Sequence, residues 1–120
     1  MKEYTTSVNT IWNYQVPFEL LIAHRYPRAE MVVFDIHSLM TDIYYKPAAY
    51  LQSPANVTSW VNQCSVDGKT CTTIGSIDSF FWFDELHPSQ GVDKVIAREF
   101  LKVVAGNSSY ATYWRSGNDD

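Results

Sequence analysis

The chain has 120 residues, 46% of them hydrophobic and 18% charged, which is the composition of one globular domain and too apolar for a disordered chain. A net charge of −4, with Lys and Arg scattered singly, excludes the basic surface that nucleic acids or anionic membranes require. No apolar run approaches the roughly 18 residues of a membrane-spanning helix, so we expect a neutral small molecule or glycan as partner.

Apolar residues recur at helical spacing from about residue 5 to residue 26, which predicts a helix there. Pro17 lies inside this pattern, so we expect a kink or two short helices. His24 and Arg25 come in the last turn, where positive charge favours the helix dipole. A structural role is therefore the favoured interpretation of His24.

Residues 31–34, MVVF, form a continuous apolar run, typical of a strand that is buried on both faces of a parallel sheet. Asp35 closes this strand, and Asp35 or Ser38 is expected to cap a helix over 39–45. Asp35 and His37 follow a strand, where α/β enzymes place catalytic groups, but capping is the favoured interpretation.

Between residues 47 and 79 the periodicity fades and turn-forming residues become frequent, which predicts a long loop. Cys64 and Cys71 flank the polar segment SVDGKT, which a disulfide would staple; two buried thiols are the alternative, and the spacing disfavours zinc. Tyr50 and Trp60 are candidate sugar-stacking residues in this loop.

Asn56-Val57-Thr58 and Asn107-Ser108-Ser109 fit the N-glycosylation pattern, although such triplets often arise by chance. With the cysteine pair, they favour a secreted protein. The first twelve residues, MKEYTTSVNTIW, lack the apolar stretch of a signal peptide. Secretion would therefore require a signal peptide upstream of Met1.

Residues 79–83 form a second apolar run and predict a second buried strand, in which the three rings at 81–83 mainly fill the core and one reaches a substrate cleft. A helix is expected over 90–104 and ends at Gly106. Its expected buried face comprises Val92, Val95, Ile96, Phe100, Val103 and Val104. We assign 1–106 to the domain and 107–120 to a polar tail.

The order of helix, strand, helix, long loop, strand and helix predicts an α/β fold, with parallel strands joined by right-handed crossovers. Two core strands make an incomplete sheet, because strands buried on both faces need neighbours. We therefore expect part of a larger fold.

Asp84-Glu85-Leu86-His87-Pro88 lies between the second strand and the last helix. A His at this edge of a sheet can take a proton from a serine hydroxyl, and a nearby carboxylate fixes its tautomer. Pro88 stiffens the turn and suits the start of a helix. The spacing alone leaves open a surface turn with an incidental His. The three His of the chain are too dispersed to predict a metal site.

The segment FFWFDELHPSQGVDKVIAREF resembles the last conserved block of SGNH/GDSL hydrolases, whose signature is Asp-x-x-His-Pro at the start of the terminal helix. The resemblance covers about Ile11 to Ala105. Four upstream parts look like fungal secreted members, which are similar to the acetylesterases of carbohydrate esterase family sixteen: the Trp12-Asn13 helix, YPRAEMVVFDIHSLM, the segment Lys46-Pro47-Ala48-Ala49-Tyr50 and the Cys64–Cys71 loop.

This resemblance implies part of a three-layer α/β/α sandwich around a parallel sheet, with only about two of the core strands present. It also implies ester hydrolysis through a serine acyl-enzyme, without metal or cofactor, on an acetyl or short-acyl ester of a carbohydrate. His87 would be the general base and then the general acid, and Asp84 would orient it.

The Gly-Asp-Ser block that carries the nucleophile in this family does not occur in the 120 residues. Asp78-Ser79 lacks the glycine, and Gly117-Asn118-Asp119 lacks one residue of the family's Gly-x-Asn-Asp block. Without a serine and an oxyanion hole, we expect the isolated chain to be inactive.

Two hypotheses follow: part of a secreted carbohydrate esterase, or a non-catalytic secreted protein, glycan-binding or vestigial, derived from that fold. An unrelated α/β domain with a chance Asp-x-x-His-Pro is a third. Coding sequence for Gly-Asp-Ser upstream of Met1 would distinguish the first two.

Overall fold

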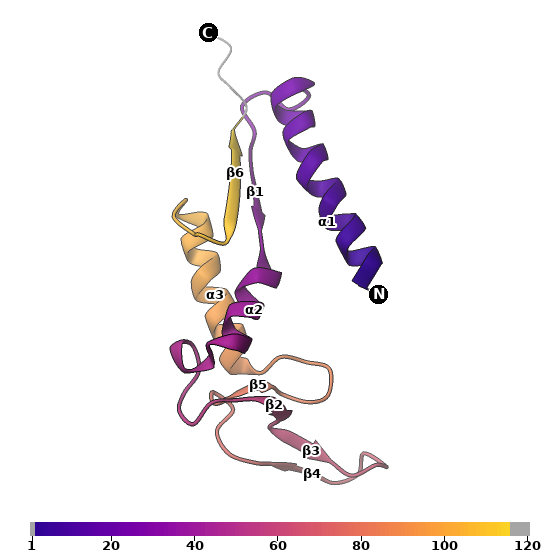
Figure 1. Ribbon diagram of the computed structural model, residues 1–120, viewed down its shortest axis with the longest axis vertical. Helices are drawn as coiled ribbons and strands as arrows, with labels where there is room; N and C mark the ends of the chain where they lie inside the picture. The colour runs from indigo at the N-terminus through magenta and orange to yellow at the C-terminus, as the bar shows by residue number, and fades with distance from the viewer. Residues whose placement is uncertain (1, 116–120) are drawn as a thin grey trace. The chain divides into compact units, whose positions relative to one another are not determined.

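A computed structural model describes residues 2–115 (Figure 1). The part described contains both helices and strands, which confirms the predicted α/β class. It divides into two compact units, one formed by residues 2–34 with 111–115 and the other by residues 35–110. The elements are α1 Lys2–Pro17, η1 Phe18–Ile22, β1 Glu30–Phe34, α2 Ile36–Tyr45, η2 Pro47–Ala49, β2 Asn56–Trp60, β3 Asn62–Cys64, β4 Cys71–Thr73, β5 Phe80–Trp82, α3 Gln90–Val104 and β6 Ala111–Arg115.

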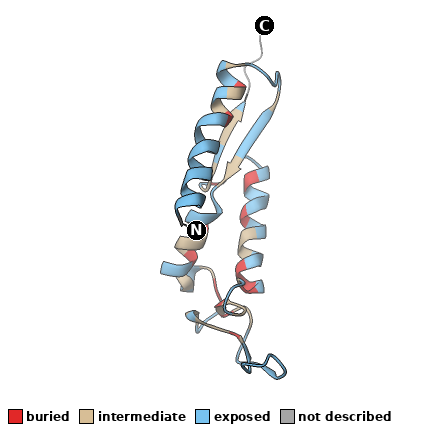
Figure 2. Ribbon diagram, turned by 90° about the vertical axis from the view of Figure 1, so that its right-hand side faces the viewer, coloured by how far each residue is buried: buried red, intermediate tan, exposed pale blue. Residues whose placement is uncertain are grey.

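In the first unit, the α-helix α1 ends at Pro17 and a short π-helical segment, η1, follows it. The helix type therefore changes directly after Pro17, at the position where a kink or two short helices was predicted, and the backbone of Pro17 itself stays helical (φ −63°, ψ −34°). Along α1, Val16 is the buried position among the side chains described, and the helix is pale blue over most of its length in Figure 2. His24, just beyond η1, has a left-handed backbone (φ 45°) and is exposed.

The strand β1 pairs antiparallel with β6, from Glu30 opposite Arg115 to Phe34 opposite Ala111. The expectation of a parallel strand buried on both faces is wrong for these residues, because a two-stranded ribbon leaves much of its surface in solvent. Met31 and Val32 are 37% and 39% exposed.

The strand β6 lies within the segment 107–120, which we expected to be a polar tail. Its sequence, ATYWR, contains residues that favour strands, but it lacks the apolar alternation that would have identified it. Gly117-Asn118-Asp119 lies outside the described residues.

In the second unit, β2 and β5 pair in parallel and β3 and β4 form an antiparallel hairpin. The long loop predicted over 47–79 is thus wrong in part, since it contains β2, β3, β4 and η2. These strands have three to five residues and few apolar positions, so that backbone pairing rather than a hydrophobic pattern defines them.

The core of this unit lies between α2, α3 and the short sheet. Its most buried apolar side chains are Leu39, Ile43, Val61, Phe81, Val92 and Val103, each at most 2% exposed. Glu99 is also buried, at 6%, and accepts hydrogen bonds from Lys102 Nζ (2.8 Å) and Ser108 Oγ (2.6 Å). These two bonds lower the pKa of the Glu99 carboxyl, so the charge is retained where it is buried.

The predicted buried face of α3 is correct for Val92 and Val103 and wrong for Phe100 and Val104, which are 53% and 71% exposed. The face in contact with the core runs through Val92, Glu99 and Val103. Phe100 and Val104 lie to one side of that line.

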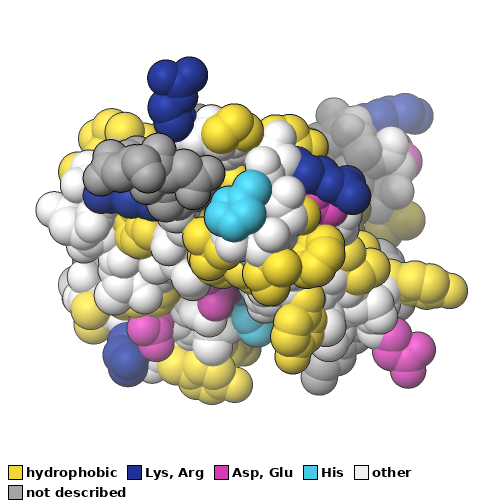
Figure 3. All heavy atoms as spheres, turned by 90° about the horizontal axis from the view of Figure 1, so that it is seen from above, with side chains coloured by type: hydrophobic (Ala, Val, Ile, Leu, Met, Phe, Trp, Pro, Cys, Tyr) yellow, Lys and Arg dark blue, Asp and Glu magenta, His cyan; other side chains and the backbone are white. Residues whose placement is uncertain are grey.

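Many large hydrophobic side chains are exposed, and several hydrophobic side chains are visible on the face shown in Figure 3. A small domain normally buries most of these groups. No helix among residues 2–115 is long and apolar enough to cross a membrane.

Candidate active site

The segment after β5 is a tight turn closed by backbone hydrogen bonds. The N–H of Phe83 donates to the carbonyl of His87 (2.8 Å), and Trp82 and Pro88 form an antiparallel bridge. The N–H of Ser89 then donates to the carbonyl of Phe81 (2.9 Å). These bonds return the chain alongside β5 and fix the four residues between Phe83 and Pro88 at the carboxyl end of that strand.

Within this turn, the structure brings Asp84 and His87 together, as the sequence predicted. Both carboxylate oxygens of Asp84 lie 2.9 Å from Nδ1 of His87. Oδ1 also accepts the backbone N–H groups of Leu86 (2.9 Å) and His87 (2.8 Å). One carboxylate therefore closes the turn and orients the ring.

These contacts set the electrostatics of the pair. The hydrogen bond from the Leu86 N–H, followed by those from the His87 ring and N–H, lowers the pKa of Asp84 to about 2. The carboxylate is therefore ionised at neutral pH and holds the proton of His87 on Nδ1. Nε2 is then the basic nitrogen, on a side chain that is 70% exposed.

Ser89 links the turn to α3. Its hydroxyl donates to the carbonyl of Phe80 and accepts the N–H of Val92 (3.3 Å), so that it caps the helix. The residue is completely buried. The position of the turn relative to α3 is thus fixed by a buried side chain, one residue beyond Pro88.

The strand β2, which pairs in parallel with β5, brings the start of the β3–β4 hairpin to the carboxyl end of β5. The N–H of Val61 donates to the carbonyl of Trp82 (3.1 Å), and that of Asn62 donates to the carbonyl of Phe83 (2.8 Å). Asn62, the first residue of the β3–β4 hairpin, therefore lies beside the residue that precedes Asp84. No sequence motif indicates this neighbour, because the contact depends on strand pairing between distant segments.

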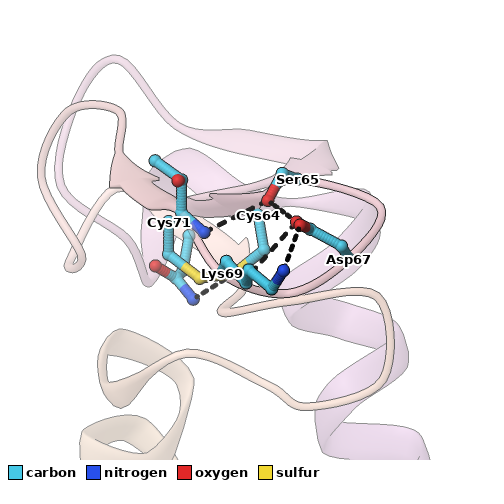
Figure 4. The surroundings of a disulfide bond; sticks show 7 residues. Cys64, Ser65, Asp67, Lys69 and Cys71 are labelled. Atoms are coloured by element: carbon cyan, nitrogen blue, oxygen red, sulfur yellow. Dashed lines mark hydrogen bonds and ion pairs between the residues drawn. A yellow bond between two sulfur atoms is a disulfide. The ribbon is translucent and has the colours of Figure 1, made fainter.

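The hairpin that begins at Asn62 contains the disulfide between Cys64 and Cys71 (Figure 4). Its tip is ordered by Ser65, whose hydroxyl donates to Asp67 Oδ1 (2.6 Å) and accepts the N–H of Thr70 (3.1 Å). The covalent link and these bonds close the hairpin, which begins beside Phe83, the residue that precedes the Asp84 turn.

An aromatic groove of about 350 Å³ lies between α2 and β5. It is lined by His37, Met40, Thr41, Tyr44, Tyr45, Phe81 and Trp82. Tyr44 meets Tyr45 and Phe81 edge to face, with ring centroids 5.4 and 5.9 Å apart. Phe81 is buried at 2%, as core packing predicts, whereas Trp82 is half-buried and reaches the groove.

The remaining candidate residues have partners outside the Asp84–His87 turn. Asp35 caps α2 by accepting the N–H of Ser38 (2.9 Å), which confirms the capping interpretation, and His37 is exposed on the first turn. Tyr50 Oη lies 3.1 Å from Tyr110 Oη, which donates to Asp42 (2.8 Å). Tyr50 thus belongs to a polar network.

The two glycosylation triplets differ in setting. Asn107 is exposed just after α3. Asn56 is half-buried in β2, and its Oδ1 accepts the N–H groups of Thr58 (3.0 Å) and Ser59 (2.9 Å). Among residues 2–115, no group of three or more His, Cys, Asp or Glu side chains is arranged to hold a metal ion.

No protein-family model matches the sequence. The chain is similar to an acetylesterase from Hypocrea jecorina, with 51% identity over 115 residues. The match includes 95% of this chain and 33% of the relative, so the chain spans about a third of that protein's length. At this identity the matched segments are homologous.

Proposed function

We propose that this chain supplies the acid–base half of a serine-type ester hydrolase that acts on acetyl or short-acyl esters of carbohydrates. The observation that carries the proposal is the Asp84–His87 pair, 2.9 Å apart at the end of a parallel strand, in a chain that is 51% identical to an acetylesterase segment. The arrangement is that of a triad without its nucleophile.

In the proposed mechanism, a serine from the remainder of the fold attacks the acyl carbon and gives its proton to Nε2 of His87. Asp84 stabilises the imidazolium that forms. The imidazolium then protonates the departing sugar oxygen, which leaves an acyl-serine. Water attacks this ester after losing a proton to Nε2, and the acid is released as the serine recovers its proton.

The nucleophile is the part of this mechanism that the 120 residues do not supply, since they contain no Gly-Asp-Ser. Loss of the serine in other serine hydrolases lowers the rate by about 10⁶-fold, and the residual activity depends on an oxyanion hole. We therefore propose that the isolated chain is inactive. We also propose that the active assembly is an SGNH-type α/β/α sandwich, which would provide neighbours for β2 and β5.

The carbohydrate part of the proposal is supported by the aromatic groove. Sugar rings present C–H faces that stack on aromatic side chains, and Tyr45 is 76% exposed at this groove. Trp82 lies in the same groove, two residues before Asp84, so a bound sugar would have its ester within the region of the turn.

We also propose that the protein is secreted. The Cys64–Cys71 disulfide is favoured in an oxidising compartment, and Asn107 is exposed in a glycosylation triplet. A non-catalytic glycan-binding protein could share these two features, but glycan binding does not require an ionised Asp84 that orients the His87 ring.

The proposal is tested with a chimera in which the matched 115-residue segment of the Hypocrea jecorina acetylesterase is replaced by that of this chain. We expect the chimera to hydrolyse p-nitrophenyl acetate, and the isolated chain to leave it unchanged. A soluble, folded chimera without hydrolytic activity would contradict the proposal.

A further inference from the structure

The helix α3 has three distinct faces, and the function proposed above uses none of them directly. One face packs into the core through Val92, Glu99 and Val103. The other two are turned away from that core, and they differ sharply in chemistry.

The second face is basic. Lys94, Arg98 and Lys102 recur every four residues, which places them in one row along the helix. Lys94 is paired with Asp78 (2.7 Å) and Lys102 with Glu99 (2.8 Å). The basic row is a normal solvated helix surface, and it needs no partner.

The third face is apolar. Ala97, Phe100, Leu101 and Val104 recur at spacings of three and four, and we call this row the apolar stripe of α3. Phe100, Leu101 and Val104 are 53%, 68% and 71% exposed. Because the basic row already provides the solvated side, the stripe is a second packing surface that lacks its partner within its own unit, residues 35–110.

The relative indicates what this partner is. The chain matches 33% of the Hypocrea jecorina acetylesterase, so about two thirds of that protein lies outside the matched segment. Surfaces that join the segment to the remainder are part of the relative's folded structure. At 51% identity, we expect this chain to have the same joining surfaces. In the absence of the remainder, such surfaces would be exposed and apolar.

We propose that the apolar stripe of α3 is the docking surface for the portion of an acetylesterase fold that this chain lacks. The inference rests on the proposed function, because that portion is the one that would supply the serine. Ser89 ties the start of α3 to the Asp84–His87 turn, so docking along α3 also fixes the turn relative to the incoming nucleophile.

The test uses a double variant that carries both Leu101→Asp and Val104→Asp. It is examined in the isolated chain and in the chimera described above. The matched control is Arg98→Asp on the basic row. The side chains of Leu101 and Val104 are largely exposed in the isolated chain, so we expect the double variant to leave its circular dichroism spectrum unchanged. In the chimera, we expect the double variant to lower Tm by roughly 5–10 °C and the control to change it by less than about 2 °C.

Equal Tm values for the double variant and the control in the chimera would overturn the docking proposal. A homodimer of the isolated chain that the double variant dissociates, and that the chimera retains, would assign the stripe to a second copy and also overturn it. An insoluble wild-type chimera counts against docking too, and exchange of residues 80–106 alone then tests the esterase function.

The two proposals fail in different ways. A chimera whose stability depends on the stripe but which is inactive supports docking and contradicts the esterase proposal. An active chimera whose Tm is not lowered by the double variant supports the esterase proposal and contradicts docking.

Discussion

The carboxylate of Asp84 lies 2.9 Å from Nδ1 of His87, and the same carboxylate accepts the backbone N–H of His87 at 2.8 Å. The residue that would act as base is therefore held at both its ring and its backbone by one side chain. Asp84 therefore has two roles. Its hydrogen bonds to backbone N–H groups hold the turn, and its contact with the ring supports the proposed chemistry of His87.

Asp84→Asn tests this separation in the chimera. The Asn side chain keeps an oxygen that can accept the N–H groups of Leu86 and His87, so the turn is expected to persist. It loses the charge that stabilises the imidazolium, and kcat should fall on the order of 10⁴-fold. Steady-state hydrolysis of p-nitrophenyl acetate measures the loss, with the neighbouring, exposed Glu85→Gln as control. A reduction of less than about tenfold would argue against a triad role for Asp84.

The pKa of Asp84 can be measured directly by NMR titration of its carboxyl carbon in the isolated chain. We expect a midpoint of about 2. In His87→Ala, the midpoint should rise but remain below the ordinary value, because the Leu86 N–H is the larger cause of the shift. A midpoint near 3.8 in the wild-type chain would show that the turn does not form in solution.

The sign of the linked stability follows from this shift. Because the folded pKa lies below the unfolded one, the unfolded chain binds the proton first as pH falls. The contribution of Asp84 to stability is present above about pH 4 and is lost as the pH falls toward 2.

Cys64→Ser with Cys71→Ser is expected to loosen the β3–β4 hairpin. The disulfide closes a short loop with a sequence separation of 7, for which the chain-entropy estimate is about 2.4 kcal/mol, or roughly 60-fold in protection factor. Amide hydrogen exchange at Ser65, whose N–H donates to Thr70, reports the effect. Exchange along α3 should stay the same, and an unchanged rate at Ser65 would exclude a stapling role.

Tyr45→Ala tests the aromatic groove in the chimera. Loss of a stacking ring should raise KM for acetylated xylo-oligosaccharides by about tenfold and leave KM for ethyl acetate unchanged, because the latter has no sugar ring. Tyr14→Ala is the matched control, since Tyr14 and Tyr45 are each 76% exposed and lie in different units. An equal KM increase for both esters would remove the groove from sugar binding.

Expression in a secreting yeast should attach a glycan at Asn107, because this side chain is exposed beyond α3. Endoglycosidase treatment should then reduce the mass of the wild-type chain by the expected glycan. Asn107→Gln should lose that mass shift, and Asn9→Gln, outside any glycosylation triplet, should keep it. A wild-type chain secreted with no glycan at Asn107 would contradict the assignment.

The sequence was informative where local patterns determine the structure. The change of helix type after Pro17, the cap formed by Asp35 and the Asp84–His87 turn all depend on residues within a few positions of one another. Such contacts cost little chain entropy and leave recognisable motifs.

Contacts between distant segments were missed. The pairing of β1 with β6 joins residues about 80 positions apart along the chain. The sequence of neither strand indicates which other strand it pairs with. Asn62 reaches the turn through the pairing of β2 with β5. On α3, apolar residues occupy two faces, so the hydrophobic pattern alone could not tell which face meets the core of this chain.

The most direct test of the central claim is the activity of the chimera with and without the His87 ring. We expect His87→Ala to reduce kcat for p-nitrophenyl acetate by at least about 10⁴-fold, while His24→Ala, at an exposed position far from the turn in sequence, leaves it unchanged. Retention of the wild-type rate in a correctly folded His87→Ala chimera would contradict the assignment of His87 as the catalytic base.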